Sequence, residues 1–120
     1  MSTYHLLDNM TAAATLTTLP QGQSVSPPGS LPNTPAQNQI FQIEITGVGS
    51  LSASVQILVS NDTGPDPNDF NWQDYGAPIS VTGTDVGSAA MAGTEPWANF
   101  GAYLVSVSGT NASVTVLMSA

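Results

Sequence analysis

The chain has 120 residues, which is enough for one domain with a substantial core but not for two. Only 7% of its residues are charged, and it contains no Lys or Arg, so its formal net charge is −8. Binding to nucleic acid or to an anionic membrane is therefore not expected, since phosphate groups repel an acidic surface. A basic protein surface is the partner that this charge balance favours.

Two features that the sequence lacks exclude further classes of function. The chain has no Cys, which excludes disulfides, thiolate metal sites and Cys nucleophiles. Its first residues, MSTYHLLDNM, lack the basic segment of a typical signal peptide, and no apolar run approaches the roughly 18 residues of a membrane span. We therefore expect a soluble protein that is synthesised in a cytoplasm.

Residues 1–38 predict an extended N-terminal arm. The arm contains one possible strand, around Ala13 to Leu19, and then a proline-rich connector. Proline cannot donate a backbone hydrogen bond, which excludes a helix and a central strand here. The connector is expected to lie over the surface or against a neighbouring subunit. Its prolines are Pro27, Pro28, Pro32 and Pro35.

Residues 39–120 predict the folded core. In residues 40–46 and 51–59, apolar and polar side chains alternate, as in half-buried antiparallel strands. The link GVGS between them, residues 47–50, predicts a tight turn. The apolar side consists of Phe41, Ile43 and Ile45, then Ala53, Val55, Ile57 and Val59.

The remaining segments complete an all-β pattern. A short strand is expected through Ile79 and Val81, and residues 84–96 are small, show no period and predict irregular structure. Two alternating strands follow, and SGTN at 108–111 predicts the hairpin turn between them. We expect an antiparallel, jelly-roll-like β-sandwich of seven or eight short strands, with the N-terminal arm extended beside it.

The segment SNDTGPDPNDFNWQDYG, residues 60–76, holds four of the eight carboxylates, including Asp62, Asp66 and Asp69. Oxygen ligands of this kind suit calcium, but the spacing does not match an EF-hand loop and no Glu closes it. Asp, Asn, Gly and Pro are also the usual residues of turns. We interpret the segment as the tip between two strands, with these three Asp residues kept as metal candidates.

No motif indicates catalysis. A glycosidase needs two carboxylates about 5 to 9 Å apart in a desolvated cleft, and a polar, proline-rich loop offers little cover. His5 is the only histidine, and it lies in the first residues of the chain, which are usually too mobile for a catalytic triad. We therefore expect no enzymatic activity and no cofactor.

Aromatic residues gather in the second half of the chain. They suit either a platform for sugars or packing at the ends of a sandwich and at an interface, and packing is the commoner role. These residues are Trp72, Tyr75, Trp97, Phe100 and Tyr103.

The second half resembles a known family. The strand end VQILVSND is followed by a loop, then by FNWQDYGAPISVTGT, and finally by WANFGAYLVSVSGTNASVTVLMS. This layout, over residues 39–120, resembles small virion proteins of tailed bacteriophages. In those proteins an S-N-D strand end precedes a W-x-x-(x)-G turn, and a G-T-x-A/S turn joins the last two strands.

The resemblance implies a capsid decoration (cement) protein that binds the outside of a phage capsid and bridges its subunits. Its partners would be the major capsid protein and further copies of itself, as a dimer or trimer. Many relatives carry Arg or Lys where residues 100–109 of this chain are neutral, so the resemblance does not identify the surface that this chain uses for docking. The residues expected to contact a partner are Tyr4, Leu6, Leu7, Pro27, Pro28, Leu31, Trp72 and Trp97.

Two alternatives stay open. The chain is also consistent with a tail, fibre or head-fibre component of a phage virion, although it lacks the long repeats of a fibre shaft. The other alternative is a carbohydrate-binding β-sandwich module that uses Trp72, Tyr75 or Trp97.

Overall fold

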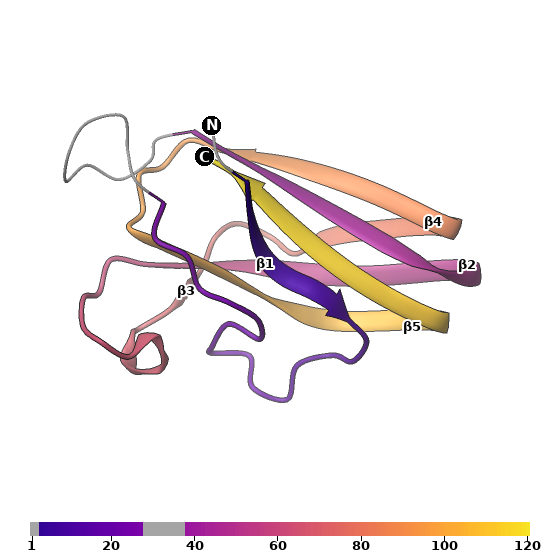
Figure 1. Ribbon diagram of the computed structural model, residues 1–120, viewed down its shortest axis with the longest axis horizontal. Coiled ribbons are helices and arrows are strands. Elements are labelled where there is room, and N and C mark those ends of the chain that lie inside the picture. The colour runs from indigo at the N-terminus through magenta and orange to yellow at the C-terminus, as the bar shows by residue number, and fades with distance from the viewer. Residues whose placement is uncertain (1–2, 28–37) are drawn as a thin grey trace.

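The computed structural model describes residues 3–27 and 38–120, in which five strands account for nearly all regular structure (Figure 1). A single 3-10 turn, η1 (Pro67–Asp69), is the other regular element of these residues. The strands are β1 (Thr3–Met10), β2 (Gln39–Ser60), β3 (Gln73–Asp74), β4 (Ile79–Gly93) and β5 (Asn99–Ser119).

All strand pairs are antiparallel and belong to one sheet. β2 is central: it pairs with β5 along one edge and with β4 and β3 along the other, and β1 pairs with the far edge of β5. The prediction of an all-β, antiparallel chain is confirmed. The strand order of a jelly roll is not confirmed, because the hydrogen-bonded strands form a single five-stranded sheet.

The three long strands all bend at the same level. Figure 1 shows β2, β4 and β5 each turning back on themselves at one end of the molecule. Positive φ angles occur there in each strand, at Gly49 (75°), Asp85 (63°), Gly109 (131°) and Asn111 (54°). Glycine, Asn and Asp are the residues that adopt this left-handed region most readily, so their placement explains where the sheet folds over.

The bend of β4 is tight and is tied to that of β2. A side chain on Gly83 would place its Cβ only 2.0 Å from the Val86 carbonyl oxygen, so the position accepts no Cβ. The Asp85 carboxylate accepts a hydrogen bond from the backbone N–H of Gly49 at 2.6 Å. This bond joins the two neighbouring bends.

Folding over divides the sheet into two half-sheets with the core between them. Residues 39–46, 86–93 and 113–119 form the first with β1, and residues 51–60, 79–84 and 99–108 form the second with β3. Phe41 of the first and Phe100 of the second approach to 5.9 Å between ring centroids. Each such fully buried side chain stabilises the fold by about 1.5–3 kcal/mol.

The prediction of hairpin turns at residues 47–50 and 108–111 is wrong. Residues 47–50 and 108–111 lie at bends within continuous strands, and the segments on either side of each bend do not pair with one another. Residues 84–93, expected to be irregular, continue β4. The side chains of this segment do alternate between the inner and the outer face of the sheet. Three of the inward residues, Gly87, Ala89 and Gly93, are too small to give a hydrophobic signal in the sequence.

The N-terminal strand also differs from the expectation. The strand lies at Thr3–Met10, and residues 13–19 form none. Residues 14–25 instead follow the edge of β5: the N–H of Ala14 donates to Leu104 O at 3.0 Å, and that of Gln21 to Ala102 O at 2.9 Å. The described part of the predicted arm is therefore packed against the sheet, because its backbone completes an otherwise open edge.

Candidate functional site

Two loops at one end of the molecule carry most of the charge. Residues 61–78, which include η1 and the short strand β3, connect β2 to β4, residues 94–98 connect β4 to β5, and both lie opposite the bends (Figure 1). We call these two loops the acidic end. It holds five of the eight carboxylates of the chain: Asp62, Asp66, Asp69, Asp74 and Glu95.

Local hydrogen bonds fold the longer loop. Asp66 caps the 3-10 turn by accepting from Asn68 N at 3.0 Å, and Pro67 begins the turn without an N–H to satisfy. The Asp62 carboxylate accepts from Asn71 N at 2.5 Å, which closes the loop across nine residues. The prediction that this segment is a tip between two paired strands is confirmed.

The three Asp residues considered as metal ligands do not form a cluster. Asp62 and Asp66 each bind a backbone N–H within the loop. In residues 3–27 and 38–120, no three His, Cys, Asp or Glu side chains gather as metal ligands. The structure thus does not bring Asp62, Asp66 and Asp69 together, and the first two act as caps of loop backbone.

Two tryptophans stand partly exposed at the acidic end. The Trp72 indole N–H donates to Pro67 O at 3.0 Å, and its ring lies 5.8 Å from that of Phe70. The Trp97 indole N–H donates to the Glu95 carboxylate at 3.3 Å. Both rings are therefore held in place by the loop that carries them and present part of their surface to solvent.

The other aromatic candidates belong to the core. Phe100 and Tyr103 are buried, and the ring of Tyr75 packs edge-on against Phe41 at 6.1 Å. The Tyr75 hydroxyl accepts from the N–H of Glu95 at 3.3 Å and so links the two loops. A platform built from all five aromatic residues is excluded, because Phe100 and Tyr103 are buried, whereas Trp72, Tyr75 and Trp97 each remain partly exposed.

A buried asparagine, which sequence reasoning missed, joins the acidic end to the N-terminal segment. Asn99 donates from Nδ2 to Ser60 O at 3.0 Å and to Asp62 O at 2.9 Å. Its Oδ1 accepts from the Ser26 hydroxyl at 2.5 Å. Nothing in the sequence around residue 99 distinguishes this role from that of a turn residue. An open pocket of about 430 Å³ lies beside it, lined by Ser24, Ser26, Asp62, Thr63, Gly64, Pro67, Phe70, Ala98 and Asn99.

Electrostatics at the acidic end affect one buried phenol. Burial raises the pKa of Tyr103, and the negative charge of Asp74 raises it further. Both causes favour the neutral hydroxyl over the phenolate.

The N-terminal residues expected to contact a partner differ in how far they are buried. Leu6 and Leu7 are fully buried core residues, so they offer no surface to a partner in this conformation. Tyr4 is half-buried on β1, and Pro27 is buried. Pro28 and Leu31 lie outside the described residues.

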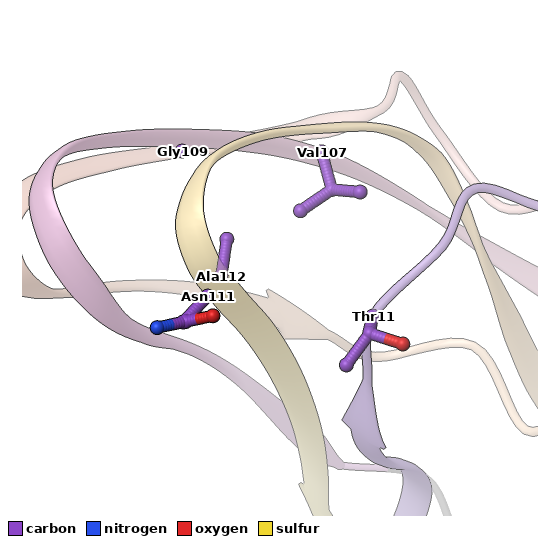
Figure 2. A pocket seen from close by; sticks show the side chains of 5 residues that line it. All are labelled: Thr11, Val107, Gly109, Asn111 and Ala112. Atoms are coloured by element: carbon purple, nitrogen blue, oxygen red, sulfur yellow. The ribbon is translucent and has the colours of Figure 1, made fainter.

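Two further pockets show no reactive grouping. One, of about 450 Å³, includes His5 and Asp8, whose exposed side chains lie 4.0 Å apart. The other, of about 400 Å³, lies where β5 bends beside the end of β1 (Figure 2). Its lining has no ionisable side chain and consists of Thr11, Val107, Gly109, Asn111 and Ala112.

Comparisons of the chain with protein-family models, with curated proteins and with solved structures each returned no match. Within the described residues, no helix has the length and apolar character needed to cross a membrane.

Proposed function

We propose that the chain is a structural virion protein that binds the outside of a phage capsid through its acidic end. The observation that carries the proposal is the grouping of five carboxylates and two partly exposed tryptophans on one end of the molecule. No Lys or Arg in the chain neutralises these carboxylates. A basic patch on a major capsid protein is the complementary surface.

The two residue types contribute differently to such binding. The carboxylates are largely exposed, so their attraction to a basic patch is screened by salt and acts mainly on the association rate and on orientation. Trp72 and Trp97 offer large, rigid apolar surfaces, and buried aromatic anchors usually supply most of the affinity of an interface. Their indole N–H groups are already bonded within the loops, which lowers the cost of ordering them.

To bridge capsid subunits, the decoration protein must bind to the capsid at more than one point. An assembly of several copies presents several acidic ends, and simultaneous binding then raises the overall affinity without new contacts. This arrangement accounts for how a small acidic protein stabilises a shell.

Capsid-binding experiments with charge variants test the proposal. We expect Asp66→Asn/Asp69→Asn to weaken binding to purified undecorated capsids by about tenfold at low salt and to flatten its salt dependence. The substituted amide at 66 still caps the 3-10 turn, so the loop stays folded. Affinity is measured by cosedimentation over a range of salt concentrations.

The matched control removes two charges elsewhere. Asp8→Asn/Glu44→Gln lies outside the acidic end, and we expect capsid affinity close to that of the unmodified chain. Equal losses in the two double variants would show that only net charge matters. An affinity of the unmodified chain that is indifferent to ionic strength would remove the acidic end from the interface.

A second candidate function is sugar binding at the same end. Phe70, whose ring lies 5.8 Å from that of Trp72, lines the pocket of about 430 Å³ together with Asp62 and Ser24. Sugars are bound by this combination of aromatic and polar groups. Titration of tryptophan fluorescence with a panel of glycans separates the two functions. An unchanged spectrum across the panel would leave capsid binding as the function of the acidic end.

A further inference from the structure

The pocket beside Asn99 lies where the acidic end meets the N-terminal segment. Its volume of about 430 Å³ falls within the roughly 300–1,000 Å³ of small-ligand sites. Three segments line it: residues 24–26, residues 62–70 and the start of β5 at residues 98–99. Asp62 is the ionisable residue among the lining residues.

Side-chain donors beside this pocket are already used within the fold. Asn99 donates its two side-chain N–H groups to the backbone carbonyls of Ser60 and Asp62. The Ser26 hydroxyl donates to Asn99 Oδ1 at 2.5 Å, so its oxygen is left to accept. These two side chains therefore offer a ligand no free N–H or O–H group.

Backbone donors around the pocket follow the same pattern. The N–H of Ala98 donates to Asn61 Oδ1 at 2.9 Å, and the N–H of Phe70 donates to Pro67 O at 3.2 Å. Pro67 itself has no N–H. A bound anion needs several donors from the protein, and this lining is poorly suited to supply them.

Acceptors, in contrast, remain in the pocket. The Asp62 carboxylate accepts one bond, from Asn71 N to Oδ2, whereas a carboxylate has about four lone-pair sites. The hydroxyl oxygens of Ser24 and Thr63 are also able to accept. No Lys or Arg in the chain neutralises the half-buried Asp62. Charge and hydrogen-bonding capacity therefore both favour a cation with several N–H donors.

One wall of the pocket is aromatic. Phe70 is half-buried and lines the pocket, and its ring is held 5.8 Å from that of Trp72. A Cβ at Gly64 would lie 3.9 Å from Phe70 Cε1, so the lack of a side chain there leaves this part of the ring uncovered. A planar guanidinium stacks on an aromatic ring and pairs with a carboxylate more readily than an ammonium does.

We propose that this pocket binds the guanidinium group of an arginine side chain, presented by the basic protein surface that the acidic end engages. A guanidinium has five N–H donors and no acceptor, which matches a lining of acceptors whose own donors are used. Sugar hydroxyls need donors as well as acceptors from their site, so they fit this lining less well. The inference rests on the proposed function for its partner and adds the residue type by which the partner is recognised.

Binding of N-acetyl-arginine amide to the full chain tests the pocket without a capsid. We expect a dissociation constant on the order of 1 mM, measured by NMR from shifts of backbone amide signals at residues 62–64, 70 and 98–99. The citrulline analogue, which has nearly the same shape but no charge, should bind at least about tenfold more weakly. The lysine analogue should also bind more weakly, because its ammonium does not stack. Equal binding of either analogue, or shifts confined to other residues, would overturn the proposal.

Two substitutions in the pocket have expected effects on this binding. Asp62→Asn keeps an oxygen acceptor for Asn71 N, so the loop stays folded, and it should lower the affinity for the arginine compound about tenfold. Phe70→Leu keeps an apolar side chain and should lower it about threefold. Glu44→Gln removes one charge from β2, outside the acidic end, and should leave the affinity unchanged. Equal losses in Asp62→Asn and Glu44→Gln would show that only net charge attracts the compound and would refute a specific pocket.

Capsid binding separates this inference from the proposed function. Asp62→Asn should lower the affinity for undecorated capsids as it lowers that for the arginine compound. Capsid binding that depends on Asp66 and Asp69 but not on Asp62 would overturn the arginine pocket and leave the proposed function standing. A chain that binds the arginine compound at the pocket but binds no capsid would instead contradict the proposed function and support the guanidinium site.

Discussion

Single residues at the acidic end have two different roles. Asp62, Asp66 and Asn99 bind backbone groups and fix the loops, whereas Trp72 and Trp97 are held in place and remain partly exposed. Sequence reasoning interpreted the aspartate-rich segment as a tip between two strands and kept Asp62, Asp66 and Asp69 as metal candidates, but it did not predict which backbone groups they bind. Turn residues and calcium ligands are the same residue types, so only the three-dimensional spacing separates the two roles.

Tyr103 and Asp74 give a test at the scale of one side chain. Because burial and the Asp74 charge raise the pKa of Tyr103, we expect Asp74→Asn to lower that pKa toward its usual value. The contribution of Tyr103 is measured as the difference in phenolate absorbance between each chain and its Tyr103→Phe counterpart during alkaline titration.

The sign of the stability change follows from the same shift. A tyrosine whose pKa is higher in the folded than in the unfolded state stabilises the fold below its unfolded pKa of about 10, and this contribution is lost as the pH rises through the folded value. We expect the Asp74→Asn chain to lose less stability over that pH range. An unchanged Tyr103 titration in Asp74→Asn would rule out the electrostatic cause.

At the scale of elements, the sequence predicted the strands better than their connections. Alternation of apolar side chains correctly located both segments of β2 and of β5, because inward residues such as Phe41 and Val55 are large. It missed residues 84–93, whose inward residues are mostly Gly and Ala. Bends and hairpin turns both require positive φ, so glycines at 47–50 did not distinguish a sheet that folds over from a pair of adjacent strands.

The bond between the bends of β4 and β2 is the element-scale test. Asp85→Ala removes the acceptor for Gly49 N and places Ala at a φ of 63°, so we expect a loss of about 1–3 kcal/mol in the free energy of unfolding. Asp85→Asn keeps an acceptor and tolerates this φ, so it should lose less. Urea unfolding measures both, and equal losses would show that the charge rather than the hydrogen bond matters.

At the scale of the whole molecule, the fold separates two ends. The loops of the acidic end lie opposite the bends of β2, β4 and β5 (Figure 1).

The proposal that the chain is a virion protein is tested most directly by its copy number in purified phage particles. The chain has no Lys or Arg, so quantitative mass spectrometry needs a protease that cleaves at aromatic residues instead of trypsin. A decoration protein should be present in a fixed ratio to the major capsid protein, on the order of hundreds of copies, because it follows the symmetry of the shell. A few copies to a few dozen would assign it to the tail, a vertex or a fibre, and its absence from the particles would refute a role in the virion.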